Sequence, residues 1–187
     1  MNSISGWGLH NPANVNILKP DSFEQLENII VNSEKNSVLP RGLGRSYGDA
    51  AQLDNKSVFS LYAFDHIYIN KKEGFITAGS GVSIDSILKK IIPEGFFIPV
   101  SPGTRNVTIG GAIASDVHGK NHHLNGSFGN YIKEILLIDG KGNLKKLSSN
   151  NNEPIEIKNQ FWATIGGMGL TGVIIEATFS LIPIKTS

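Results

Sequence analysis

Apolar and polar positions recur along the chain with two periods, and these periods predict a mixed order of helices and strands. Apolar residues three and four positions apart indicate amphipathic helices, whereas strict alternation indicates strands. Helices are predicted at residues 22–32, 84–92, 109–115 and 159–165. Strands or extended runs are predicted at residues 14–18, 37–40, 57–61, 67–70, 75–78, 96–100, 131–138, 144–147 and 172–183. The first strand, helix and strand form a βαβ-like start.

Side-chain caps support three of the helix starts. Asp21, Ser83 and Thr108 precede the apolar periodicity, and their oxygens can accept hydrogen bonds from the first helical turn. Residues 118–129 lack periodicity and are predicted to form a loop, because Gly119 and Asn121 disfavour a helix there.

The composition excludes several classes of function. The 187 residues are 40% apolar and 18% charged, which is typical of a soluble globular chain with one domain or two small subdomains. A net charge of +1 gives no electrostatic case for nucleic-acid binding. The absence of cysteine excludes disulfides and thiolate chemistry. Residues 1–10 show no signal peptide, and no apolar run approaches the roughly 20 residues that span a bilayer. A cytoplasmic location is therefore expected.

The 21 glycines are the compositional oddity, and many of them lie in two segments. The first segment, Arg41-Gly-Leu-Gly-Arg-Ser-Tyr-Gly48, follows a predicted strand. Its glycines let successive backbone N–H groups face one concavity, and its two arginines favour an anion such as a diphosphate. No amphipathic helix follows and no Gly-Lys-Ser/Thr is present, so the segment is neither a Rossmann nor a Walker loop. The alternative is a tight connection without a ligand.

The second glycine-rich segment spans residues 101–130. Pro102-Gly-Thr104 and Thr108-Ile-Gly-Gly111 predict a second nest and a helix N-terminus at which a ligand can touch the backbone. Two such segments in one small domain favour a long dinucleotide, which needs separated contacts.

The remaining chemistry-bearing residues leave alternatives open. His118, His122 and His123 are predicted to line a polar cofactor pocket, with loop capping as the alternative and metal binding disfavoured because no glutamate lies nearby. Lys120 and Arg105 are either ligand contacts or surface charges. No hydrolase motif surrounds Ser46, and no metal site is expected. Trp7 and Trp162 are expected to be core or packing residues.

With these motifs in view, the chain resembles the FAD-binding half of vanillyl-alcohol-oxidase-type flavoproteins, whose cofactor domain is of the PCMH type. Within that family it is most similar to the branch that acts on a polyprenyl-phosphoryl ribose. The resemblance covers essentially the whole chain. It rests on residues 6–8, 41–49, 102–105, 107–113, 116–123, 126–130 and 161–172, of which His118-Gly-Lys-Asn-His-His123 is specific to this branch.

The resemblance implies an α+β fold of two subdomains, about residues 1–60 and 61–187, with FAD between them. It implies that residues 41–47 hold the diphosphate, that residues 118–121 approach the flavin, and that Ile174 touches the adenosine side. The expected cofactor contacts are Arg41, Gly42, Leu43, Gly44, Arg45, Ser46, Tyr47, Gly103, Thr104, Thr108, Gly110, Gly111, His118, Gly119, Asn121 and Ile174. Many relatives bind the flavin covalently through a histidine where this chain has Arg45, so FAD is expected to be non-covalent here.

The implied function is the FAD-binding domain of an oxidoreductase that oxidises a secondary alcohol of a sugar. The expected group is the 2′-hydroxyl of a polyprenyl-phosphoryl ribose, with hydride transfer to flavin N5. Such oxidases continue into a substrate-binding cap that is expected to lie outside this chain. Catalytic residues are therefore not assigned, apart from His118 and Lys120 as groups near the flavin or substrate. A reductase partner and membrane association through a lipid-linked substrate are left open. The alternatives are an oxidase acting on an alditol, an aldonolactone or a nucleotide sugar, and a non-catalytic flavin-carrying module.

Overall fold

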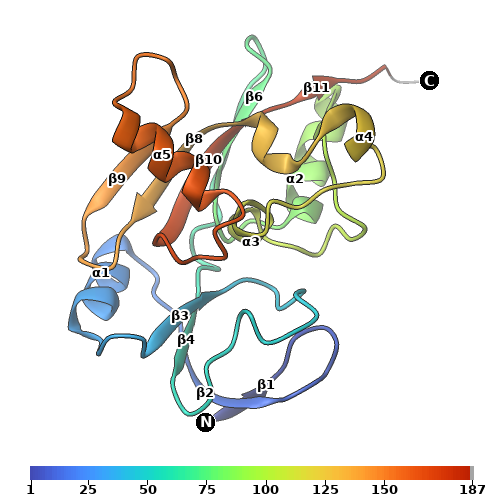
Figure 1. Cartoon of the computed structure of the whole chain (residues 1–187). Helices are drawn as coiled ribbons and strands as arrows, with labels where there is room; N and C mark the ends of the chain where they lie inside the picture. Colours follow the sequence, from blue (N-terminus) through green and yellow to red (C-terminus); the bar gives the residue numbers. More distant parts are fainter. Residues whose placement is uncertain (186–187) are drawn as a thin grey trace.

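The chain folds into two α+β halves built on separate sheets (Figure 1), as seen in a computed structural model that describes residues 1–185. The first sheet has four strands in the order β1-β2-β4-β3, and the second has five in the order β5-β6-β10-β8-β9. A short pair, β11-β7, lies beside the second sheet. The α+β class predicted from the sequence is confirmed.

The bounds of the elements follow the predicted order closely. The strands are β1 (Asn2–Ile4), β2 (Ala13–Leu18), β3 (Val38–Arg41), β4 (Ser57–Ser60), β5 (Ile67–Asn70), β6 (Phe75–Gly79), β7 (Phe96–Phe97), β8 (Ile132–Ile138), β9 (Leu144–Ser148), β10 (Val173–Ser180) and β11 (Ile182–Pro183). The α-helices are α1 (Phe23–Asn32), α2 (Ile84–Ile91), α3 (Ile109–Ala114), α4 (His122–Asn125) and α5 (Ile155–Thr164). Two 3₁₀ turns cover Ile92–Glu94 and Phe128–Tyr131. Among the described residues, no helix is both long and apolar enough to cross a bilayer.

The first half confirms the βαβ-like start. Strands β2 and β3 both run parallel to β4, which lies between them, and α1 makes the crossover. Ser22 rather than Asp21 caps α1, because its Oγ accepts a hydrogen bond from the Gln25 N–H at 3.3 Å. This arrangement delivers the chain at Arg41, the end of β3, to the boundary between the two halves.

The second half is an antiparallel sheet with α2 and α3 packed on one face. Its core combines Ile84 and Ile87 of α2, Ile113 of α3, and Ile76 and Phe179 of the sheet. These side chains are almost fully buried, so α2 and α3 are packed tightly against the sheet.

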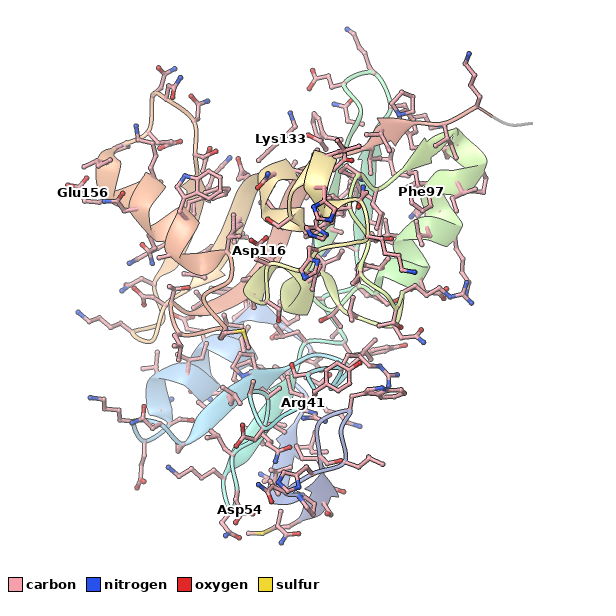
Figure 2. The ribbon with its side chains drawn as sticks, turned by 45° about the vertical axis from the view of Figure 1, so that its right-hand side comes forward. Arg41, Asp54, Phe97, Asp116, Lys133 and Glu156 are labelled. Atoms are coloured by element: carbon pink, nitrogen blue, oxygen red, sulfur yellow. The ribbon has the colours of Figure 1, made fainter. Side chains whose placement is uncertain are left out.

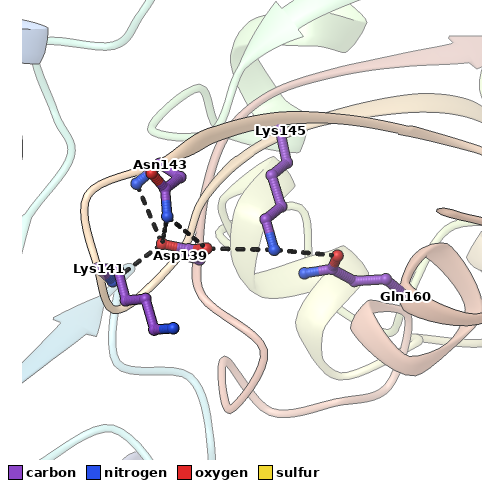
Figure 3. Close-up of polar contacts among 5 residues, drawn as sticks. All are labelled: Asp139, Lys141, Asn143, Lys145 and Gln160. Atoms are coloured by element: carbon purple, nitrogen blue, oxygen red, sulfur yellow. Dashed lines mark hydrogen bonds and ion pairs between the residues drawn. The ribbon is translucent and has the colours of Figure 1, made fainter. Parts of the chain in front are cut away.

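The β8–β9 hairpin closes through an aspartate-centred turn (Figure 3). Asp139 accepts hydrogen bonds from the N–H groups of Lys141 and Asn143, and Lys145 bridges it to Gln160 of α5. Residues 139–143 therefore form the turn that joins the predicted strands at 131–138 and 144–147.

An apolar cluster joins the two halves. It contains Leu26 of α1, Phe59 of β4, Ile138 of β8, and Val173 and Ile175 of β10. Because burial of this cluster removes apolar surface of both halves from water, it stabilises their relative placement.

Several predictions about single segments are wrong. A one-turn helix, α4, interrupts the predicted loop at residues 118–129, because Gly119 supplies a carbonyl for the His122 N–H and Gly126 ends the turn with φ of +66°. Helix α5 begins at Ile155, directly after Pro154, rather than at residue 159.

Three further differences concern the chain ends and the tryptophans. The last strand is broken after Ser180, because β11 leaves the main sheet to pair with β7. Strand β1 was not predicted. Trp7 and Trp162 are 56% and 52% exposed, so neither belongs to the core.

Candidate functional site

A cavity of about 320 Å³ lies at the boundary of the two halves. This volume is within the range of small-molecule sites. Its walls come from the β3 end and the first glycine segment on one side, and from α3 and the loops at Ser80 and Gly172 on the other. The lining residues are Pro40, Arg41, Gly42, Leu43, Gly44, Arg45, Ser46, Ala50, Ala51, Ser60, Leu61, Tyr62, Ser80, Gly81, Val107, Thr108, Gly110, Gly111, Ala114, Ser115, Val117, Met168, Gly169, Gly172 and Ile174.

The backbone of the first glycine segment offers free donors to this cavity. Within residues 1–185, the N–H groups of residues 43–46 make no hydrogen bond to another protein group. The carbonyls of Ser46 and Tyr47 are occupied, since they accept from the N–H groups of Trp7 and Gly8 at 2.7 and 3.2 Å. A run of unpaired N–H groups is the basis of an anion-binding nest. Binding of an anion at residues 43–46 stays a prediction.

Arg41 lies at the end of β3, where the first glycine segment begins (Figure 2). Its guanidinium donates to the carbonyls of Ala51 and Ser5 at 2.7 and 2.6 Å. A Cβ built on Gly44 would lie 2.3 Å from Arg41 Nη2, so the guanidinium lies directly beneath the turn of the loop. Burial lowers the pKa of Arg41 from its ordinary value. Two of its five N–H donors are thus used within the protein, and a contact of this side chain with a ligand stays a prediction.

Arg45 spans the boundary between the halves. Its Nε donates to the Asn106 carbonyl at 3.1 Å, and its guanidinium carbon lies 4.4 Å from the centre of the Trp7 ring. The contact with Trp7 is a cation–π interaction, which holds the arginine at the cavity wall.

The glycines of α3 act through their lack of side chains. Thr108 caps α3, with Oγ1 accepting from the Gly111 N–H at 3.2 Å. The N–H groups of Ile109 and Gly110 donate to the carbonyls of Val82 and Ser80. The first turn therefore has its N–H donors paired within the protein, while Thr108, Gly110 and Gly111 line the cavity and their contact with a ligand stays a prediction. Gly110 lets α3 approach Ser80 closely, because a Cβ on Gly110 would lie 3.0 Å from Ser80 Cβ.

The cavity favours an anion attached to apolar rings. Two arginines and no acidic residue lie among its lining residues, while Leu61, Val117 and Ile174 give it apolar walls. The unpaired N–H groups and the arginines supply positive potential to the cavity, and apolar side chains form other parts of its wall.

Some predicted cofactor contacts lie outside the cavity wall. They are Tyr47, Gly103, Thr104, His118, Gly119 and Asn121. Residues 118–121 follow Val117, which does line the cavity, and Asn121 Nδ2 is bonded to the Pro99 carbonyl at 3.0 Å. Their contact with a flavin stays a prediction.

The three histidines of this region lie together. The ring centres of His118 and His122 are 5.1 Å apart, and those of His122 and His123 are 4.0 Å apart. In the part of the chain that is described, no three His, Cys, Asp or Glu residues are arranged to hold a metal ion. The exposed side chains of His118 and Lys120 remain available to a ligand.

Sequence reasoning missed part of the second wall. Ser80 and Gly81, directly after β6, line the cavity, as do Leu61, Ser115 and Met168. The signal that could have revealed Ser80 is its position between Gly79 and Gly81 at the end of a predicted strand.

Comparison with known proteins gives a consistent result. Residues 16–148 match the family described as FAD binding domain. The chain is 38% identical to decaprenylphosphoryl-β-D-ribose oxidase of Mycolicibacterium smegmatis over 98% of its own length. It is 24% identical to a D-lactate dehydrogenase of Anaerostipes hadrus over 91%, and 25% identical to cytokinin dehydrogenase 2 of Arabidopsis thaliana over 77%. The chain spans 40%, 37% and 28% of the lengths of these relatives.

Proposed function

The chain belongs to the FAD binding domain family, and from this membership we propose that it is the cofactor-binding part of an FAD-dependent oxidoreductase that oxidises a secondary alcohol of a sugar. Bound FAD supplies a two-electron acceptor that can take a hydride from a carbinol carbon. The residues of this chain bind and orient that cofactor.

One observation carries the proposal. Residues 43–46, whose N–H groups are unpaired within residues 1–185, line a cavity that has no acidic residue and several apolar side chains in its wall. A dinucleotide has this distribution of chemistry, with a central diphosphate and a ring system at each end. The two walls also approach each other closely at Gly42, because a Cβ there would lie 2.4 Å from Thr108 Oγ1. The wall residues therefore fit FAD.

The sugar substrate is proposed from similarity. The 38% identity to decaprenylphosphoryl-β-D-ribose oxidase extends over 98% of the chain. The chain spans 40% of that relative, so substrate groups and the base that accepts the hydroxyl proton are expected on residues beyond the present chain. Reaction with a lipid-linked ribose would also bring the protein to a membrane surface.

The substrate proposal is tested on the complete protein that contains this chain. Anaerobic mixing with decaprenylphosphoryl ribose is expected to bleach the visible absorption of the flavin, whereas D-lactate is expected to leave it unchanged. Bleaching by D-lactate alone would favour the alternative suggested by the D-lactate dehydrogenase relatives. No bleaching by either alcohol, in a protein that binds FAD, would favour a flavin-carrying role.

FAD binding itself is expected to be reversible. Arg45 is the residue in the first loop at which covalent relatives carry a histidine, and a guanidinium cannot form that bond. Acid precipitation or denaturant should therefore release all of the flavin into the supernatant. Flavin that stays with the denatured chain would contradict this expectation.

A further inference from the structure

Ser80 presents an unusual feature in the cavity wall. It lines the cavity and is only 2% exposed, yet within residues 1–185 its hydroxyl oxygen has no hydrogen-bond partner. A buried hydroxyl without a partner is unfavourable, because it has lost its hydrogen bonds to water and gained none in return. Such a group calls for an explanation, and a ligand in the cavity is the simplest one.

The surroundings of Ser80 fix its position. Its N–H donates to the Ile175 carbonyl at 2.8 Å, and its carbonyl accepts from the Gly110 N–H at 2.9 Å. Both backbone groups are thus paired and hold the residue between β10 and α3. The bare Cα of Gly110 packs on its side chain, since a Cβ there would lie 3.0 Å from Ser80 Cβ. Only the hydroxyl is left for a further bond.

The two ends of the cavity differ in exposure. Ser80 lies at the N-terminal end of α3, beside Leu61 and Ile174, which are 9% and 6% exposed. At the other end of α3 the wall continues to Ser115, which is exposed, and then toward His118. The reacting ring of a flavin must meet a substrate, so it suits the exposed end. The enclosed end then takes the adenosine.

We propose that the Ser80 hydroxyl hydrogen-bonds a polar group of the adenosine half of FAD and so contributes to cofactor affinity. This proposal rests on the FAD site described above. It makes Ser80 a binding residue that neither the glycine motifs nor the comparisons assign.

The test compares Ser80→Ala with Ser86→Ala, a control of the same chemistry on the exposed face of α2 outside the cavity. FAD dissociation constants are measured by flavin fluorescence quenching, and thermal unfolding is followed without ligand, with FAD and with ADP. Because Ser80 Oγ bonds no protein group, Ser80→Ala should not lower the unfolding temperature without ligand. Loss of one hydrogen bond should raise the dissociation constant for FAD about three- to tenfold. ADP should stabilise the wild type and Ser86→Ala more than Ser80→Ala.

Each outcome decides between named possibilities. Equal FAD affinity of the wild type and Ser80→Ala would overturn the proposal and leave the FAD site intact. Weaker FAD binding with undiminished stabilisation by ADP would place Ser80 at the flavin and overturn the adenosine assignment, as would absence of any ADP effect on the wild type. Failure of the wild type to bind FAD would overturn the proposed function as well. A lower unfolding temperature of Ser80→Ala without ligand would indicate a structural role instead.

Discussion

Gly44→Ala is the sharpest test of how the first glycine segment is built. Gly44 has φ of +65°, a left-handed conformation that a side chain disfavours. A Cβ at this position would also lie 2.3 Å from Arg41 Nη2 and 2.9 Å from Arg41 Cζ. The guanidinium has little freedom to move, because it is bonded to the carbonyls of Ser5 and Ala51. The substitution must therefore displace either the loop or the arginine.

The expected loss of stability follows from these two contributions. The left-handed backbone costs about 1 kcal/mol, and loss of one hydrogen bond from a charged donor costs about 1.5–3 kcal/mol. Their sum, about 2.5–4 kcal/mol, corresponds to a fall in the unfolding temperature of about 5–15 °C for a chain of this length. The displaced N–H groups of residues 43–46 should also weaken FAD binding by about tenfold or more.

The assay is thermal unfolding followed by circular dichroism, together with a titration of FAD. Gly48→Ala is the matched control in the same loop, because no protein atom lies within 4 Å of its Cβ position and its φ is not positive. Equal unfolding temperatures for the two variants would refute the reasoning. The double variant Arg41→Ala/Gly44→Ala should lose less stability than the sum of the single variants, since removing the guanidinium removes the clash.

Three other predictions concern separate features of the fold. Although burial by itself would raise the pKa of Asp139, hydrogen bonds from Lys141 and Asn143 hold it at about 2, below the ordinary 3.8. Asp139 should therefore stabilise the fold above about pH 4 and lose this effect as the pH falls through 2. In urea unfolding at neutral pH, Asp139→Asn should be less stable than wild type by roughly 1 kcal/mol, a value already discounted for solvent screening. This difference should disappear in acid. Arg45→Met should speed FAD release severalfold in stopped-flow measurements, because the contact across the boundary is lost; an unchanged rate would contradict a role at the cavity wall. Thr108→Val should lower the free energy of unfolding, measured by urea unfolding, by about 1 kcal/mol, because α3 loses its cap. An unchanged free energy would contradict the capping role of Thr108.

Much of the fold could be predicted because the signals are local. Helix α2 is read from apolar residues three and four positions apart and from its cap Ser83, which the structure confirms through the 3.0 Å bond from the Ser86 N–H. The hairpin turn at Asp139 and the cap at Thr108 are likewise contacts within a few residues. Short segments were less predictable. Helix α4 has one turn and depends on the Gly119 carbonyl more than on any periodic pattern.

The sequence by itself determined that two glycine-rich segments exist, that the first follows a strand, and that its backbone can form an anion nest. Only the tertiary structure decided which donors are free. The first-turn N–H groups of α3 are paired by carbonyls of Val82 and Ser80, and the Arg41 side chain is held by the Ser5 and Ala51 carbonyls. These partners lie 10 to 36 residues away in the sequence, so the contacts depend on how each half folds rather than on any local pattern. Likewise, the unpaired hydroxyl of Ser80 is a property of the tertiary structure, because β10 and α3 together bury it.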